Sequence, residues 1–106
     1  MISFKPAEAR GDVLAYGAYD ENAAECGLCR FTLGGYDMKI LSVEGEDIIC
    51  EGLLRSSMNF CAQRGAYIAH FEPEIIPAAV RLGFSAEKTA VEIPDALASS
   101  CCSCGK

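Results

Sequence analysis

Cysteine is the residue type with the most obvious chemistry in this chain of 106 residues, which contains seven of them. Cys26 and Cys29 have the Cys-x-x-Cys spacing of redox-active dithiols and zinc sites. Those sites use a helix N-terminus or a tight turn to lower the thiol pKa. Here both residues fall in a segment predicted to be a strand, where positions three apart face opposite sides. We therefore interpret Cys26 and Cys29 as ordinary strand residues.

A second group of cysteines lies at the end of the sequence, with three thiols among four consecutive residues. Such a group can bind a soft metal ion or form mixed disulfides. A closed tetrahedral zinc site needs a fourth ligand, for which the sequence offers Cys26, Cys29 or His70. The alternative is a flexible cysteine-rich tail over residues 95–106. The candidate metal ligands are Cys101, Cys102 and Cys104.

Other side chains with catalytic potential occur singly. His70 is the one histidine of the chain, and as a base it would need a nucleophile or a substrate amine, neither of which the sequence identifies. Tyr36 and Tyr67 are acids by residue type, but each fits a half-buried aromatic residue of a strand better. Cys50 and Cys61 fall on the apolar face of a predicted helix, so we interpret them as core residues.

The elements that position these residues begin with a run of strands. Alternating or β-branched composition predicts strands at residues 2–6, 12–19, 25–33 and 37–43. The turn signals Asp20-Glu21-Asn22 and Gly34-Gly35 separate the last three of these strands. We therefore expect those three to form an antiparallel meander.

The hydrophobic period then changes from two to 3.6, which predicts a helix over residues 47–64. Glu46 or Asp47 is expected to cap its start, where free N–H groups need an acceptor. Arg64 and Gly65 provide the stop signal. The apolar face of this helix contains Cys50, Leu53, Leu54, Ser57, Met58 and Cys61.

The last part of the chain predicts a strand at residues 66–71, a short helix at 72–82 that ends at Gly83, and a strand at 89–93. Pro77 does not suit a helix interior, so the regular part of that helix should begin there. A helix joins the strand at 66–71 to the preceding one, which predicts parallel pairing with a right-handed crossover. The fold class is therefore α+β, with a central mixed sheet of five to six strands and two helices.

This order of elements resembles that of the GNAT superfamily of acyl-CoA-dependent N-acetyltransferases. The residues that carry the resemblance are 38–43 (Met-Lys-Ile-Leu-Ser-Val), 52–65, 79–84 (Ala-Val-Arg-Leu-Gly-Phe) and 1–7. The resemblance implies a GNAT-like sheet, acetyl-CoA as the cofactor, and acetyl transfer to an unknown amine. Residues 6–12 leave no room for the helices that the family places between its first two strands. We therefore expect a truncated or degenerate member that lacks them.

The resemblance also implies a cofactor site. Backbone groups of the strand at 37–43 would pair with the pantetheine arm, and the helix start would approach the diphosphate. In this sequence Glu44, Glu46 and Asp47 place negative charge there, and unit charges about 5 Å apart repel by about 3 kcal/mol at an effective dielectric constant of about 20. Ala79 occupies the position of the usual general acid, a tyrosine. The implied cofactor-binding residues are Ser42, Val43, Gly45, Asp47, Ile48 and Ile49.

Two functions stay open at this point. One is an N-acetyltransferase that acts on a small-molecule or peptide amine. The other is a non-catalytic GNAT-fold binding or regulatory module with a metal- or thiol-reactive tail, in which Glu46 or Asp47 caps the helix and takes the place of the phosphate.

Composition narrows the partners and the compartment. A net charge of -6 opposes binding to nucleic acid or to an anionic membrane. No apolar run reaches the length of a membrane span and no signal peptide is recognisable, so we expect a cytoplasmic protein. Residues 1–106 are expected to form one domain, and its small size makes a homodimer the expected assembly.

Overall fold

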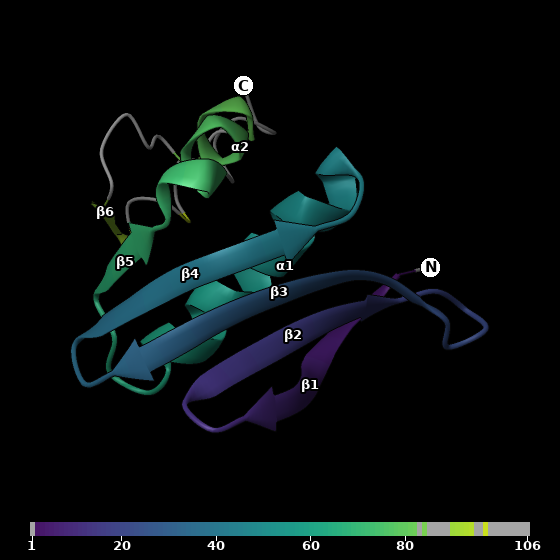
Figure 1. Ribbon diagram of the computed structural model, residues 1–106, viewed down its shortest axis with the longest axis horizontal. Coiled ribbons are helices and arrows are strands. Elements are labelled where there is room, and N and C mark those ends of the chain that lie inside the picture. The colour runs from purple at the N-terminus through teal and green to yellow at the C-terminus, as the bar shows by residue number, and fades with distance from the viewer. Residues whose placement is uncertain (1, 83, 85–89, 95–96, 98–106) are drawn as a thin grey trace.

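The structure is a computed structural model that describes residues 2–82, 84, 90–94 and 97 (Figure 1). The strands of this part of the chain form one mixed sheet in the order β1-β2-β3-β4-β5-β6. Two α-helices and a short 3-10 helix accompany the sheet, so the predicted α+β class is confirmed. None of the helices in the described ranges is long and apolar enough to cross a membrane.

Four strands form an antiparallel meander: β1 (Ser3–Arg10), β2 (Val13–Tyr19), β3 (Glu25–Gly34) and β4 (Asp37–Glu44). The first is longer than its predicted range of 2–6, because Ala7 and Arg10 continue the pairing with β2. Only Gly11 and Asp12 separate β1 from β2, and Gly11 has a φ of 59°, a conformation that glycine adopts without strain. The prediction that no helix lies between the first two strands is confirmed.

The second half of the fold is a helical crossover to β5, followed by two short helices and a last strand. The helix α1 (Asp47–Ala62) leads to β5 (Ile68–Phe71), which pairs with β4 in parallel as predicted. The predicted helix at 72–82 is divided into the 3-10 helix η1 (Pro73–Ile75) and α2 (Ile76–Arg81), because each proline lacks an N–H donor and fits only a first turn.

The last strand, β6 (Ala90–Glu92), pairs antiparallel with β5. It lies within the predicted range of 89–93. Gly83 and Thr89, at the predicted end of the second helix and start of this strand, lie outside the described residues. The predicted tail at 95–106 does so as well, except for Leu97.

The hydrophobic core lies between α1 and one face of the sheet. Phe31 and Ile40 point from the sheet toward Leu53, Leu54 and the other buried residues of the helix. The ring of Phe60 meets that of Phe31 edge to face, with centroids 6.0 Å apart. In Figure 1, α1 lies behind β2–β4, and no described helix crosses the near side of β1–β3. The meander is therefore covered on one face only.

Candidate functional site

The strands β4 and β5 separate halfway along β4. Their parallel pairing runs from Asp37 and Ile68 to Ile40 and Phe71. The N–H of Glu72 then donates to the carbonyl of Ile40 at 3.2 Å, after which the chain turns into η1. Because β4 continues to Glu44, its last residues have no strand partner on the β5 side within the described ranges. This segment, residues 41–44, is called the open edge of β4 below.

A β-bulge lies at the start of the open edge. Ile40 pairs with Phe31 and Ser42 pairs with Arg30, so Leu41 is an extra residue of β4. Such a bulge bends its strand and redirects the backbone groups beside it, and bulges are common next to active sites. The bulge therefore lies where β4 and β5 diverge, adjacent to the predicted pantetheine-binding residues Ser42 and Val43.

The start of α1 differs from the prediction. Glu46 is the N-cap residue, in an extended conformation, but no side chain accepts a hydrogen bond at the cap. The expectation that Glu46 or Asp47 caps the helix is therefore wrong. The thiol of Cys50 donates to the carbonyl of Gly45 at 3.3 Å, a contact that provides no acceptor for a helix N–H group, and Gly45 has a φ of 135°. The N–H groups of the first turn are left without a side-chain acceptor at the cap.

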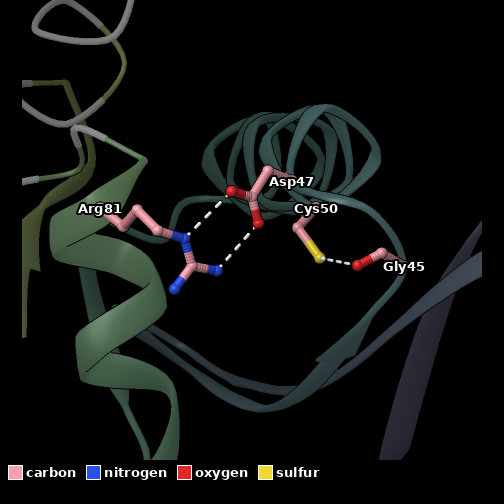
Figure 2. Close-up of polar contacts among 4 residues, drawn as sticks. All are labelled: Gly45, Asp47, Cys50 and Arg81. Carbon is pink, nitrogen blue, oxygen red and sulfur yellow. Dashed lines mark hydrogen bonds and ion pairs between the residues drawn. The ribbon is translucent and has the colours of Figure 1, made fainter.

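Asp47 is turned away from its own helix because it binds Arg81 at the end of α2. Figure 2 shows the two contacts: Nε of Arg81 donates to one carboxylate oxygen at 3.1 Å, and Nη2 donates to the other at 2.9 Å. The hydrogen bonds that Arg81 donates to Asp47, and the negative charge of Asp47, raise the pKa of Arg81. The two side chains are more than half exposed. A negative charge predicted to oppose a diphosphate is thus compensated by a guanidinium group at the same place.

The remaining predicted cofactor-binding residues lie on two sides of the connection between β4 and α1. The side chain of Ile48 is 74% exposed, whereas that of Ile49 is buried in the core. Gly45 borders a hollow of about 280 Å³ between the start of β3 and the end of β4. The hollow is acidic, because Glu25 and Glu44 also line it. The six predicted residues therefore lie along one continuous stretch, from the open edge of β4 to the first turn of α1.

The Cys-x-x-Cys pair is split between two environments, as predicted. Cys26 is exposed and its thiol lies 3.4 Å from the carbonyl oxygen of Ala18. Cys29 is buried under α1, where burial raises its pKa to about 12. No group of three or more metal-ligating side chains occurs in the described residues. The predicted metal ligands, Cys101, Cys102 and Cys104, lie outside them and stay predictions.

The other two described cysteines are core residues, as predicted. Cys50 and Cys61 are buried on α1. Burial raises the pKa of Cys61 to about 11, and burial followed by the charge of Asp47 raises that of Cys50. Since the thiolate is the nucleophile, these two thiols and that of Cys29 should be unreactive at neutral pH.

A variant with the three tail cysteines changed to serine tests this. At pH 8 we expect iodoacetamide to alkylate Cys26 at least about tenfold faster than any other residue, because buried thiols with raised pKa values are inert. Mass spectrometry of peptides from timed samples measures the rates. Full alkylation in denaturant serves as the control. Equal rates at Cys26 and Cys29 in the native protein would contradict the assignment of Cys29 to the core.

The candidate acid–base residues lie away from the open edge of β4. Tyr36 and Tyr67 lie outside the strands, 63% and 36% exposed, so their prediction as half-buried strand residues is wrong. Their rings stack with centroids 5.5 Å apart. Nε2 of His70 lies 3.6 Å from Asp37 at the start of β4. None of these groups lies near residues 41–44 by strand register, and Ala79 is buried.

Comparison with known proteins gives one informative result. No protein-family model and no curated protein matches the chain. Among solved structures, a nourseothricin acetyltransferase matches with a TM-score of 0.56 and 19% identity, over 70% of this chain and 51% of the other. The chain has a GNAT-like fold. At this identity the likeness shows the fold alone, and the chain covers about half the length of that acetyltransferase.

Sequence reasoning missed two parts of the candidate site. The bulge at Leu41 had a signal, because the apolar residues Met38, Ile40 and Val43 change from even to odd positions. The pairing of Arg81 with Asp47 had none, because 34 residues separate the two in the sequence.

Proposed function

We propose that this protein binds an acyl-CoA along the open edge of β4 and transfers an acetyl group from acetyl-CoA to an amine. The observation that carries the proposal is the divergence of β4 from β5 next to the start of α1. A strand edge without a partner offers N–H and C=O groups in a row. The amide groups of a pantetheine arm can pair with such groups, and Ser42 and Val43 would then hold it.

The start of α1 supports the diphosphate part of the same ligand. Its first-turn N–H groups and the positive end of the helix dipole attract an anion. Arg81 adds a guanidinium, which binds phosphate in a bidentate manner. Glu46 opposes the ligand, and Asp47 competes with it for Arg81. We propose that Arg81 exchanges Asp47 for a phosphate group when acyl-CoA binds.

The chemistry requires little from side chains. The amine nitrogen attacks the thioester carbonyl, its bond to the carbonyl carbon forms, and the carbon–sulfur bond breaks to release the thiolate of CoA. The proton lost by the amine ends on solvent or on the thiolate. No acid replaces the tyrosine at the position of Ala79, and general acid–base catalysis contributes about 10²–10⁴-fold. We therefore expect turnover to be slow.

Ala79 also favours a second function. With Ala79 buried and without an acid, the protein is also suited to bind an acyl-CoA without turnover, as a regulatory module. A homodimer also stays a prediction for this protein. The two functions differ in product formation and share the binding step, so one set of measurements separates them.

The test is the melting temperature with acetyl-CoA. We expect a concentration-dependent rise, since a ligand at 100 times its Kd stabilises the folded state by about 2.7 kcal/mol. The variant Arg81→Gln should bind about tenfold more weakly, because it loses a charge-assisted contact and leaves Asp47 unpaired. Asp47→Asn should bind more tightly. Arg55→Gln, which breaks an ion pair with Glu51 on α1, is the matched control and should bind like the wild type.

The outcomes are distinct. No rise in melting temperature at millimolar acetyl-CoA overturns acyl-CoA binding altogether. Binding that Arg81→Gln and Arg55→Gln weaken equally overturns the role of Arg81. Binding with no release of CoA thiol over a panel of small and peptide amines supports the non-catalytic module and rejects the transferase.

A further inference from the structure

The face of β1–β3 opposite α1 carries a concavity that the proposed function does not use. The strand register places Ala7, Ala15 and Arg30 side by side on this face. Their chain neighbours, such as Tyr16 and Phe31, pack against α1 on the other side. No helix of the described residues lies over this face in Figure 1, and the two-residue connection of β1 to β2 leaves no room for one there. The uncovered face is the one toward the viewer in Figure 1.

The concavity has a volume of about 530 Å³ and a mixed lining. This size lies within the range of small-molecule sites, about 300–1,000 Å³, which usually combine an apolar floor with a few polar groups. The floor is low because two of its residues are alanines, and the side chain of Ala15 is buried. The lining residues are Ala7, Arg10, Val13, Ala15, Glu25, Leu28 and Arg30.

The charged groups of the lining are separated by sign. Arg30 pairs with Ala15 across the strands, and Arg10 pairs with Val13 on the same side of the concavity. Glu25 pairs with Tyr19, four residues further along β2, or about 13 Å away at about 3.3 Å per residue. Two guanidinium groups therefore lie toward one end of the apolar floor and a carboxylate toward the other.

The guanidinium groups of Arg10 and Arg30 can both donate hydrogen bonds to a ligand. Arg10 forms no ion pair with another described residue, and the one that Arg30 forms with Glu44 is long, at 3.6 Å, with 48% of the Arg30 side chain exposed. Two arginines at one end suit an oxyanion, because the planar guanidinium donates two parallel hydrogen bonds to it. The floor residues suit a short hydrocarbon body.

We propose that this concavity binds a small amphipathic monocarboxylate, with its carboxylate at Arg10 and Arg30 and its hydrocarbon part over Ala15 and Leu28. One negative charge fits better than two, because Glu44 already compensates part of the charge of Arg30 and Glu25 repels a second anion. Neither Asp47 nor Arg81 lines the concavity. The proposal is therefore independent of acyl-CoA binding.

The test is a titration of the full chain with octanoate, followed by amide chemical shifts in ¹H–¹⁵N NMR spectra. We expect saturable shifts centred on Ala7, Ala15 and Leu28. In Arg10→Gln the affinity should fall about tenfold, since a charge-assisted contact is lost. Arg64→Gln is the matched control, because Arg64 lies over the ring of Phe60 on α1, and its affinity should equal that of the wild type.

Two further arms define the ligand and keep the test decisive. Octanol, the neutral analogue, should bind at least about tenfold more weakly, and octyl phosphate should bind no more tightly than octanoate. Ala15→Met fills the floor and should abolish the octanoate shifts while the rest of the spectrum stays folded. Shifts confined to the core under α1, or equal affinity for octanol and octanoate, would overturn the proposal. Tighter binding of octyl phosphate would overturn the preference for a single charge.

Discussion

Replacing Phe31 with alanine will lower the free energy of unfolding by about 3–5 kcal/mol, the largest effect that we expect from one substitution. Phe31 is fully buried on β3. Its ring meets Phe60 of α1 edge to face, and it pairs with Ile40 across the sheet. Removing it leaves a cavity in the layer that joins the helix to both strands. Because the whole stability of a small domain is about 5–15 kcal/mol, the variant should be close to unfolding.

Urea denaturation followed by circular dichroism measures this loss. The control is Ile48→Ala, which also truncates a large apolar side chain, but at an exposed position. It should change the free energy of unfolding by no more than about 0.5 kcal/mol. The melting temperature of Phe31→Ala should fall by about 12–40 °C, at about 4–8 °C per kcal/mol for a domain of this size. A loss below about 1 kcal/mol would mean that β3 does not pack on α1 as described.

Replacing Gly27 with valine should cost about 2–3 kcal/mol, because this glycine lies where three segments meet. A Cβ atom there would lie 2.5 Å from Cγ2 of Ile49 and 2.8 Å from the carbonyl oxygen of Glu44. The carbonyl belongs to the backbone, so the end of β4 would have to move. That movement would displace the open edge of β4, and we expect acetyl-CoA binding to weaken together with stability.

The control for this substitution is Gly34→Val at the other end of β3. No atom lies within 4 Å of a Cβ placed at Gly34, and valine favours strands. The stability of this variant should equal or exceed that of the wild type. Thermal melts of the two variants, with and without acetyl-CoA, provide both readouts. Equal losses at Gly27 and Gly34 would show that the effect comes from the loss of glycine and not from the close approach.

The elements with a clear period were predictable from the sequence. The helix at 47–64 was found to within two residues of its end, because its apolar face repeats over four turns and decides which side packs. The length of β1 was not found, since Ala7 and the residues after it carry no β-branched side chain. They are in a strand because β2 lies beside them, which is a property of the pairing and not of the residues.

The candidate site was predictable only in outline. Ser42, Val43 and the loop after them stay a prediction from resemblance, whereas the predicted capping role of Asp47 is wrong. A carboxylate at a helix start can accept hydrogen bonds either from the N–H groups of the first turn or from a cation that the fold brings near it. Arg81 lies at the end of another helix, and a linear pattern holds no information on that distance. The estimate of repulsion at the loop was therefore incomplete, because it counted anions only.

The bulge at Leu41 has a consequence for how β4 tolerates insertions and deletions. Met38 and Ile40 face α1 before it, and Val43 faces α1 after it, paired with the buried Cys29. Residues that face α1 therefore have even numbers before the bulge and odd numbers after it. Deleting Leu41 would restore a regular ladder and still leave Val43 in the core, whereas deleting Lys39 would turn Met38 or Ile40 outward. The strand holds one spare residue at this position, next to the edge where the proposed ligand would lie.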